Sequence, residues 1–306
     1  MGLVHLVDVE TYLQCPRCCS PLAGDYRCMA CAHQYRTLGP WPVLVNFDRS
    51  VLKEQQLTEL KAASLVTRRA ERSWFGVMRR LFRTRNRYAE ANIRQVLEHM
   101  PPGGRVLVVG GSTVGDGMKA VYNSVDIDVI GFDIYGSPHV QLIADAHRIP
   151  FQNGVFDAVI IQTVLEHVLS PSVVVEEIWR VLKTDGWVYS ETPFMQQVHE
   201  GPYDFTRFTE SGHRWLFAKF SIIDSGPLDG PAAQLLWSIH YLVWGLTGNR
   251  IAGLIIRTLL KPLLLLDRMV KREFRIDSTT CSYLIGQRCS SELTPGEAIN
   301  YYQGAQ

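Results

Sequence analysis

Unbroken apolar runs recur from the middle of the chain to its end and predict the strands of one sheet. They lie at residues 106–109, 129–132, 156–161, 187–190, 220–224 and 281–286. A run without polar alternation is typical of a strand covered on both faces, as in a parallel sheet. Helix-length segments separate the first four runs, among them residues 171–183, whose apolar positions share one helical face. This alternation predicts a doubly wound α/β fold.

The residues at which these runs end carry polar chemistry. Gly110 and Gly111 follow the first run, and glycine lets a backbone turn sharply and approach a ligand closely. Asp133 ends the second run, about twenty residues on, where a carboxylate can accept the two hydroxyls of a ribose. Because ligands bind outside the carboxyl ends of such strands, we expect one crevice shared by Gly110, Asp133, Gln162 and Glu191. An ordinary strand followed by a glycine turn is the alternative.

Four cysteines near the amino terminus form two closely spaced pairs, with nine residues between them. The pairs are Cys15/Cys18 and Cys28/Cys31. Two such CxxC turns can complete a tetrahedral sulfur site, which suits zinc or, less often, iron. Cys19 is a spare thiol that could substitute as a ligand, and unrelated surface cysteines are the alternative. We expect residues 1–47 to form a zinc-ribbon module whose folding depends on the metal.

The start of the chain and the cysteine pattern together indicate a compartment. The first ten residues have no basic start and no long apolar core, so no signal peptide is predicted. Clustered cysteines bind metal more often than they form disulfides in reducing cytoplasm. We therefore expect a cytoplasmic protein. Its net charge of +1 favours no class of partner.

Residues 48–87 predict a basic helical linker. Between Arg68 and Arg87 the chain has eight arginines and one acid, Glu71, with apolar residues at helical spacing. Three interpretations stay open for this amphipathic helix. It could present a solvated arginine face, lie on an anionic membrane surface, or contact nucleic-acid phosphates.

The carboxyl-terminal third contains an unusually apolar stretch. Residues 230–249 have no charged side chain, a length that would suit a membrane span. Polar residues and glycines dilute the run, however, and a span here would divide the sheet domain. We therefore expect a helical insertion over residues 230–272 that lies at a membrane interface, packs in a homodimer, or covers the crevice. Residues 290–306 form a polar tail.

A series of motifs, in order, resembles the class I S-adenosylmethionine-dependent methyltransferases. The series comprises residues 106–117, Asp133, Asp145, the FQNGVFD stretch at 151–157, the LEH stretch at 165–167 and the WRVLKTDG stretch at 179–186. The resemblance covers roughly residues 90–225. It implies a Rossmann-like methyltransferase domain over residues 88–289 with S-adenosyl-L-methionine as cofactor.

The resemblance also implies which residues hold the cofactor. Three residues of the first turn, Gly110, Gly111 and Ser112, would cradle its methionine part. Asp133 would hold the ribose, Asp145 would lie by the adenine with Ala146 against the ring, and Gln162 would close over the cofactor. One departure is Val108, which stands where the family usually has an acid. A non-catalytic scaffold with a degenerate fold is therefore an alternative.

The amino-terminal segment resembles the small zinc ribbons that accompany methyltransferases, including enzymes that methylate ribosomal RNA. The resemblance implies a metal-held accessory module. An RNA methyltransferase is thus the first rival function.

The segment after residue 193 gathers the candidate catalytic residues. His199, Asp204 and Arg207 lie in one loop that should cover the crevice. A hydroxyl acceptor must lose a proton, so we predict His199 as the base, Asp204 as the group that orients it, and Arg207 as the holder of an anionic substrate group. Alternatively, Asp204 and Arg207 form a structural ion pair and His199 is a surface residue. His167 could be packed or functional.

Together these features predict an S-adenosylmethionine-dependent methyltransferase with an amino-terminal zinc ribbon. We expect O-methylation of a glycan, a lipid-linked intermediate or a small metabolite, by an enzyme that contacts the inner face of the membrane peripherally.

Overall fold

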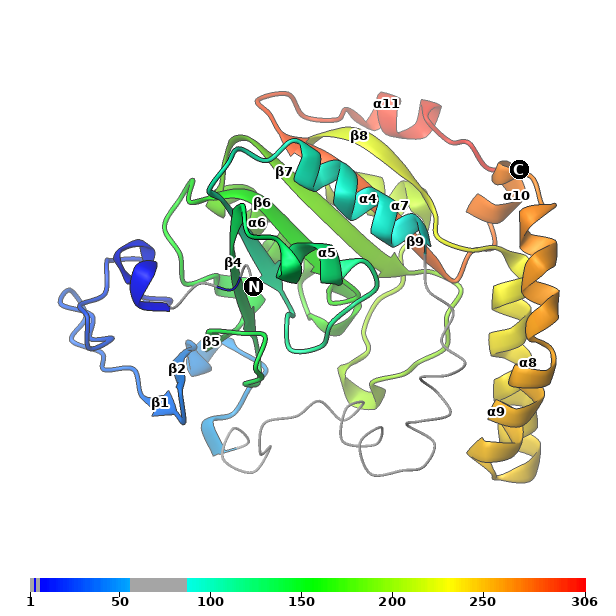
Figure 1. Cartoon of the computed structure of the whole chain (residues 1–306), viewed down its shortest axis with the longest axis horizontal. Coiled ribbons are helices and arrows are strands. Elements are labelled where there is room, and N and C mark those ends of the chain that lie inside the picture. The colour runs from blue at the N-terminus through cyan, green and yellow to red at the C-terminus, as the bar shows by residue number, and fades with distance from the viewer. Residues whose placement is uncertain (1–2, 4–5, 56–86) are drawn as a thin grey trace.

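The computed structural model describes residues 3, 6–55 and 87–306 (Figure 1). The predicted basic linker lies outside these ranges from residue 56 to residue 86, and with it nearly all of the predicted arginine-rich helix.

A nine-stranded sheet forms the centre of the described chain, in the order β1-β2-β5-β4-β3-β6-β7-β9-β8. The strands are β1 Thr37–Leu38, β2 Trp41–Leu44, β3 Gly104–Val109, β4 Ile127–Asp133, β5 Leu142–Ala144, β6 Phe156–Gln162, β7 Leu182–Pro193, β8 Phe220–Pro227 and β9 Cys281–Arg288. Strands β2 to β7 pair in parallel, whereas β9 lies antiparallel between β7 and β8. The predicted Rossmann-like α/β sheet is confirmed.

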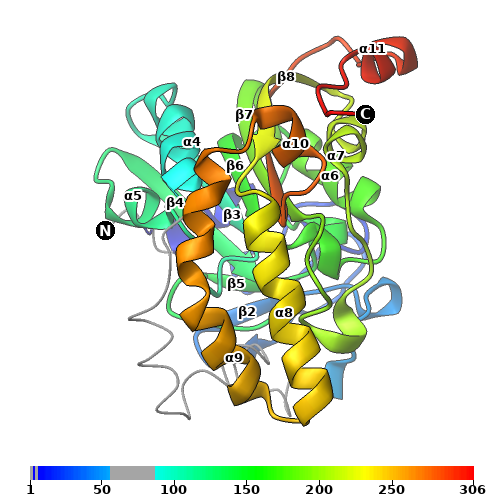
Figure 2. The ribbon, with the colours of Figure 1, turned by 90° about the vertical axis from the view of Figure 1, so that its right-hand side faces the viewer.

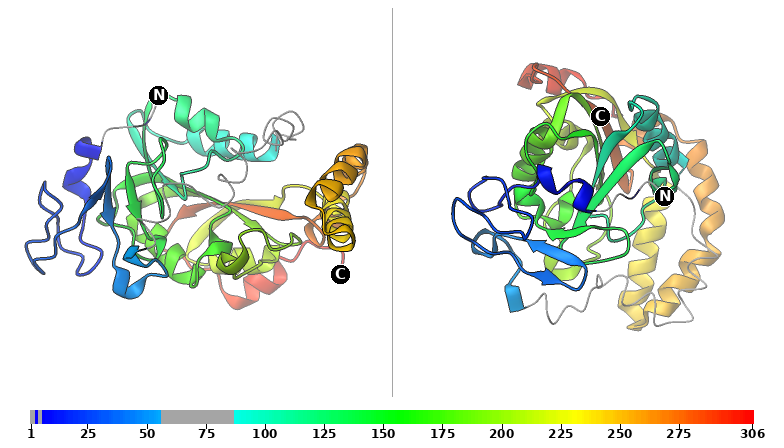
Figure 3. Two further views of the ribbon diagram at one scale, coloured as in Figure 1. Left: turned by 90° about the horizontal axis from the view of Figure 1, so that it is seen from below. Right: turned by 60° about the vertical axis from the view of Figure 1, so that its left-hand side comes forward.

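Helices cover both faces of this sheet, as the edge-on view in Figure 3 shows. The α-helices are α4 Arg87–Glu98, α5 Met118–Asn123, α6 Pro171–Val181, α7 Glu210–Leu216, α8 Pro231–Thr247, α9 Arg250–Leu259, α10 Arg272–Ile276 and α11 Pro295–Asn300. Short 3-10 turns are η1 Leu6–Asp8, η2 Glu10–Tyr12, η3 Phe47–Arg49, η4 Ala146–Arg148, η5 Leu165–His167, η6 Gly201–Tyr203 and η7 Lys261–Arg268.

Strand β3 shows why the apolar runs are unbroken. Successive side chains of a strand point to opposite faces. Val106 and Val108 pack with α4 and α5 on one face, whereas Leu107 and Val109 pack into the cluster that contains α6 on the other. All four are buried, so the strand has no solvent-facing position that would favour a polar residue.

One predicted boundary is wrong. The sequence pattern predicts a helix to residue 183 and a strand from 187, but α6 ends at Val181 and β7 begins at Leu182. Leu182 pairs with Phe156 at the start of β6, and Lys183 donates to Asp157 at 2.8 Å. These contacts with the neighbouring strand extend β7 through residues whose local sequence suggests a break.

The amino-terminal segment is continuous with the sheet. Strand β2 pairs in parallel with β5, with Val43 opposite Ile143. Leu13 and Tyr35 belong to the same buried cluster as Phe151 of the sheet domain. A segment this short buries little apolar surface of its own, so joining the larger core stabilises it.

At the far end of the molecule α8 and α9 lie side by side as a hairpin (Figure 2). Gly253 lets the two helices approach, because a Cβ there would lie 2.5 Å from the carbonyl oxygen of His240. In the part of the chain that the structure describes, no helix has both the length and the apolar character needed to cross a membrane.

Candidate active site

The turn after β3 is fastened to the end of β4. The backbone N–H groups of Gly110 and Gly111 both donate to the carbonyl oxygen of Phe132, at 3.0 and 3.1 Å. Gly110 has a φ of +74°, and a Cβ on it would lie 2.3 Å from the Val164 side chain. Only glycine fits this position, because both the backbone angle and the space exclude a side chain.

Asp133 lies directly beside this turn. Its Oδ2 accepts from the backbone N–H of Ser112 at 3.0 Å, and its Oδ1 accepts from that of Ile134 at 2.7 Å. Burial raises the pKa of Asp133 to about 6, although these two hydrogen bonds oppose the rise. The structure thus brings together the residues predicted to hold the methionine and ribose parts of a cofactor.

Gln162, the last residue of β6, stands opposite Glu191, which lies two residues before the end of β7. The Nε2 of Gln162 donates to Glu191 Oε1 at 2.9 Å and to the Asp116 carbonyl oxygen at 3.0 Å. Tyr189 donates to the same Glu191 oxygen at 2.5 Å. Burial raises the pKa of Glu191 to about 7, against these hydrogen bonds. The four predicted strand ends therefore share one edge of the sheet.

Asp145 has two protein partners in this structure. Its Oδ2 accepts from the Ser50 hydroxyl, and its Oδ1 accepts from Nδ1 of His147 at 2.7 Å. Burial would raise the pKa of Asp145, but the hydrogen bonds from His147 and Ser50 outweigh it and lower the pKa. Asp145 thus ties Ser50 of the amino-terminal segment to the sheet domain. Its neighbour Ala146 is buried. The place of both residues beside the adenine stays a prediction.

The sequence includes Glu166 in the LEH stretch without assigning it a role, yet this residue stands at the centre of a cluster of titratable side chains. The residue is fully buried, at 0% exposure, and neither carboxylate oxygen has a hydrogen-bond partner among the described residues. The Nε2 atoms of His167 and His199 lie 3.6 and 3.8 Å from its Oε1. Burial raises the pKa of Glu166 to about 8, against the field of Arg207.

Neighbouring acceptors set the tautomer of both imidazoles. His167 Nδ1 lies 2.7 Å from the Tyr203 carbonyl oxygen, which can only accept, so Nδ1 carries the proton. His199 Nδ1 likewise faces two acceptors at 3.4 Å, the Gln197 carbonyl oxygen and Asp204 Oδ2. Each ring therefore turns the lone pair of Nε2 toward Glu166. Burial lowers the pKa of both histidines, which favours the neutral form.

Arg207 organises the loop that carries His199. Its guanidinium pairs with Asp204, with Nη2 donating to Oδ2 at 2.8 Å. Its remaining N–H groups donate to the carbonyl oxygens of Gln196, Gln197 and Thr206. Every donor of Arg207 is thus used within the loop, so the structural ion pair that the sequence allows is present. Holding a substrate anion would require some of these bonds to break.

The comparison with protein families supplies the observation that decides the class. Residues 113–190 match a family model described as a methyltransferase domain. The matched span contains Asp133, Asp145, Gln162 and Glu166. The chain carries a methyltransferase domain that uses S-adenosylmethionine. The predicted enzyme class, an S-adenosylmethionine-dependent methyltransferase, is confirmed.

Other comparisons add little about activity. No curated protein matches the sequence. Among solved structures, the 4+2 cyclase SpnF is 15% identical, with 70% of this chain and 85% of that chain covered and a TM-score of 0.45. The geranyl diphosphate C-methyltransferase from Streptomyces coelicolor A3(2) is 14% identical, with 65% and 76% covered and a TM-score of 0.44. Both scores lie below 0.5, so no conclusion about the substrate follows.

Ahead of the methyltransferase domain, the four paired cysteines converge. Their sulfur atoms all lie within 4.8 Å of one another, with Cys15 3.7 Å from Cys31 and Cys18 3.4 Å from Cys28. Sulfur atoms on a tetrahedral zinc ion, with bonds of about 2.3 Å, lie about 3.8 Å apart. The donor set and the spacing fit such an ion. Cys19 is exposed and outside the cluster.

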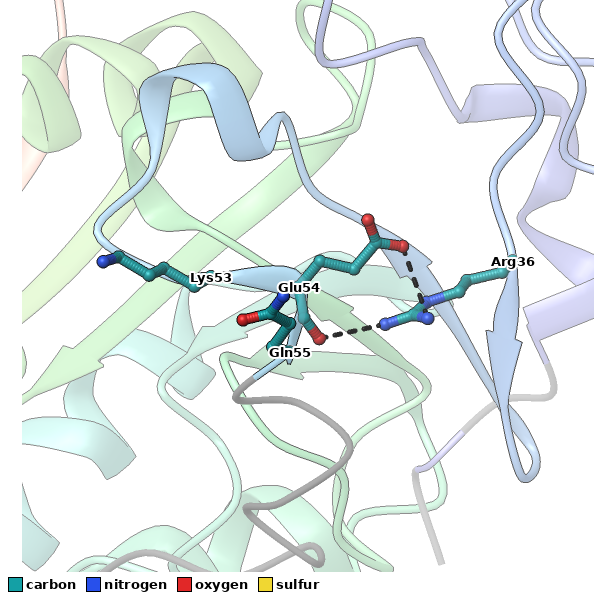
Figure 4. Close-up of a pocket in the computed structure, with 4 residues that line it drawn as sticks. All are labelled: Arg36, Lys53, Glu54 and Gln55. Carbon is teal, nitrogen blue, oxygen red and sulfur yellow. Dashed lines mark hydrogen bonds and ion pairs between the residues drawn. The ribbon is translucent and has the colours of Figure 1, made fainter.

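A depression of about 460 Å³ lies near the amino-terminal side of the methyltransferase domain (Figure 4). Arg36, Lys53, Glu54 and Gln55 line it, and Arg36 pairs with Glu54 at 3.3 Å. None of these four is a predicted site residue. The predicted site residues lie instead at the carboxyl edge of the sheet, where the glycine turn, Asp133 and the Glu166 cluster gather.

Proposed function

We propose that this methyltransferase transfers the methyl group to an oxygen atom of a glycan, a lipid-linked intermediate or a small metabolite. The observation that carries the proposal is the group of proton acceptors around Glu166. A neutral hydroxyl must lose its proton when it attacks a methyl group, and His199 presents an unprotonated Nε2 beside the crevice.

The residue roles follow the geometry. S-adenosylmethionine supplies an electrophilic methyl group on a sulfonium. Gly110, Gly111 and Ser112 would hold its methionine part and Asp133 its ribose. Asp145 and Ala146 would lie on the adenine side, with Gln162 closing the crevice. Holding the two reactants in line supplies much of the rate enhancement.

His199 would take the proton of the acceptor hydroxyl on Nε2. Asp204, held by Arg207, would keep the ring in the required tautomer and stabilise the imidazolium that forms. In this arrangement Arg207 acts through Asp204.

The hairpin formed by α8 and α9 supports an amphiphilic acceptor. It holds the catalytic loop, because Tyr241 donates to the Val198 carbonyl oxygen and Gln197 Nε2 lies 3.2 Å from the Ser238 hydroxyl. Its outer faces expose several large apolar side chains, namely Leu235, Leu242, Leu246, Ile251, Ile255 and Leu259. A lipid-linked acceptor could therefore reach the site along an apolar surface.

The charge of the same segment supports a contact with anionic lipid. Residues 230–272 contain six basic residues and one acid, Asp267. Asp267 is buried and accepts from the backbone N–H groups that begin α8. Arg250, Arg268 and Lys271 are exposed. We propose that residues 230–272 attach the protein peripherally to an anionic membrane.

Binding to vesicles with and without phosphatidylglycerol tests this attachment. Equal binding to both kinds of vesicle would contradict it, and so would a concentration-dependent dimer without lipid binding.

We further propose that the cysteine cluster binds zinc and holds the amino-terminal segment on the sheet domain. The cluster shares a buried core with the sheet through Cys15 and Cys28. Metal there would stabilise the edge at which β2 pairs with β5.

Transfer of an isotopically labelled methyl group tests the proposed acceptor class. The protein would be incubated with labelled cofactor and, separately, with small metabolites, lipid-linked glycans and total RNA. We expect label in an O-methyl group of one of the first two fractions, and labelling at least about 100-fold slower with His199→Ala. Label in RNA would support the rival RNA methyltransferase, and label on nitrogen would contradict oxygen transfer.

A further inference from the structure

We infer that Glu166, His167 and His199 form a binding site for a divalent transition-metal cation beside the methyl-transfer crevice. One carboxylate oxygen and two imidazole nitrogens, one from each residue, lie within 4.8 Å of one another. The three residues come from two separate segments, the turn η5 after β6 and the loop after β7. The backbone of Phe205 joins these segments by donating to the Glu166 carbonyl oxygen at 2.8 Å.

The unpartnered carboxylate of Glu166 is the first reason for this assignment. Buried polar groups are nearly always hydrogen-bonded, and a buried carboxylate without a partner is costly. Glu166 is fully buried, and none of the described residues donates to either oxygen. A cation between Oε1 and the two imidazoles would supply the missing partner.

The orientation of the imidazoles is the second reason. Histidine ligands usually donate their other ring N–H to a carbonyl or carboxylate oxygen, which fixes the ring and leaves the ligating nitrogen unprotonated. His167 donates to Tyr203 in this way, and His199 faces Gln197 and Asp204. Both Nε2 atoms therefore keep a lone pair available for a cation, and both lie within 4 Å of the same carboxylate oxygen.

The donor set indicates the class of cation. Two imidazoles and one carboxylate suit zinc, iron or cobalt, whereas calcium and magnesium prefer oxygen donors. Ligand atoms on such an ion, with bonds of about 2.1 Å, lie roughly 3.0–3.4 Å apart. The Nε2 atoms of His167 and His199 are 3.6 and 3.8 Å from Glu166 Oε1, so small side-chain rotations would close the site.

The site also leaves room for a further ligand. The side chains of His167 and His199 are 21% and 25% exposed, so the open side of the cluster faces solvent. An acceptor hydroxyl bound there would have its pKa lowered by the cation and would lose its proton to solvent on the open side. Its oxygen would then form the bond to the methyl group as the carbon–sulfur bond of the sulfonium breaks, with His199 acting as a ligand in place of a free base. This role in the reaction rests on the proposed function, whereas the binding of the cation does not.

Cobalt binding to the full chain tests the site. The protein would be stripped with a chelator and titrated with Co²⁺ while absorption and bound metal are measured. We expect two equivalents of Co²⁺ to bind per chain. The first, at the cysteine cluster, should show cobalt–thiolate absorption and should be lost in Cys15→Ser. The second equivalent should survive in Cys15→Ser and lack that absorption.

Variants of the cluster identify the second equivalent. Glu166→Gln keeps the shape of the buried side chain, and His167→Ala changes a partly exposed one, so at least one should remain folded. Each should weaken the second equivalent by about 100-fold or more, because each removes a ligand. His99→Ala is the matched control, since His99 is an exposed histidine outside the cluster.

The outcomes separate this inference from the proposed function. A single equivalent in the wild type that shows the cobalt–thiolate absorption, or a second equivalent unchanged in both Glu166→Gln and His167→Ala, would overturn the cation site. Methyl transfer to oxygen by protein that lacks a cation at Glu166 would leave the proposed function intact. The reverse result is also informative. A second equivalent that is weakened in Glu166→Gln and His167→Ala, in a protein that transfers no methyl group, would support the cation site and contradict the proposed function.

Discussion

The backbone N–H of His199 donates to Oδ2 of Asp204 at 2.9 Å, and the same oxygen lies 3.4 Å from Nδ1 of the His199 ring. One carboxylate thus fixes both the backbone and the imidazole of the candidate base. Burial would raise the pKa of Asp204, but hydrogen bonds from Arg207 and His199 outweigh it and lower the pKa to about 2. Asp204 therefore stays ionised at neutral pH, and the His199 ring keeps its Nε2 lone pair directed at Glu166.

Replacing His199 by alanine should reduce the rate of methyl transfer by about 10²–10⁴-fold, the usual contribution of a positioned base. Cofactor affinity should be unchanged, because His199 lies on the acceptor side. Initial rates and calorimetric titration measure the two effects. His99→Ala should retain wild-type rates, and equal rates in both variants would remove His199 from catalysis.

Replacing Asp133 by alanine should weaken cofactor binding by roughly 100-fold or more. The variant loses a charged acceptor that could take two ribose hydroxyls, each hydrogen bond contributing about 1.5–3 kcal/mol. Titration with S-adenosylmethionine and with its demethylated product measures the loss. Asp126→Ala provides the control, since Asp126 is exposed just before β4, at the opposite end of that strand. Wild-type affinity in Asp133→Ala would contradict the ribose assignment.

The affinity for cofactor should depend on pH through Asp133. Its pKa is raised to about 6, so the empty protein holds a proton there below pH 6. Ribose hydroxyls donate to the ionised form, and binding must therefore release that proton. We expect the dissociation constant to be constant above about pH 7 and to rise by about tenfold per pH unit well below pH 6. Asp133→Asn should abolish this dependence, and persistence of the same slope would assign it to another group.

Replacing Cys15 by serine should release the metal of the cysteine cluster and destabilise the domain. Cys15 is buried in the core that joins the amino-terminal segment to the sheet, so we expect a loss of about 3 kcal/mol and a melting temperature lower by roughly 6–12 °C. Metal content and thermal unfolding measure both effects. Cys19→Ser should retain metal and stability, because Cys19 is exposed and outside the cluster. Loss of metal in Cys19→Ser would make that thiol a ligand.

Several features could be predicted from the sequence because their causes are local. Strands β3, β4 and β6 follow from apolar runs that no solvent-exposed strand would tolerate. The turn at Gly110 follows from a residue type that alone adopts its backbone angle without strain. The cysteine pairs lie close in sequence, so their convergence required only two tight turns. The cofactor side of the site rests on such features.

The acceptor side was decided by the tertiary structure. Glu166 precedes His199 by 33 residues, and nothing in the sequence around it distinguishes a buried, unpartnered carboxylate from a solvated one. The parallel pairing of β6 with β7 brings the segments after both strands to one edge, where burial removes water from Glu166. Desolvation and long-range proximity are properties of the packed chain. For that reason the sequence by itself determined the fold and the predicted cofactor residues at the strand ends, whereas only the folded structure assembled the Glu166, His167 and His199 cluster.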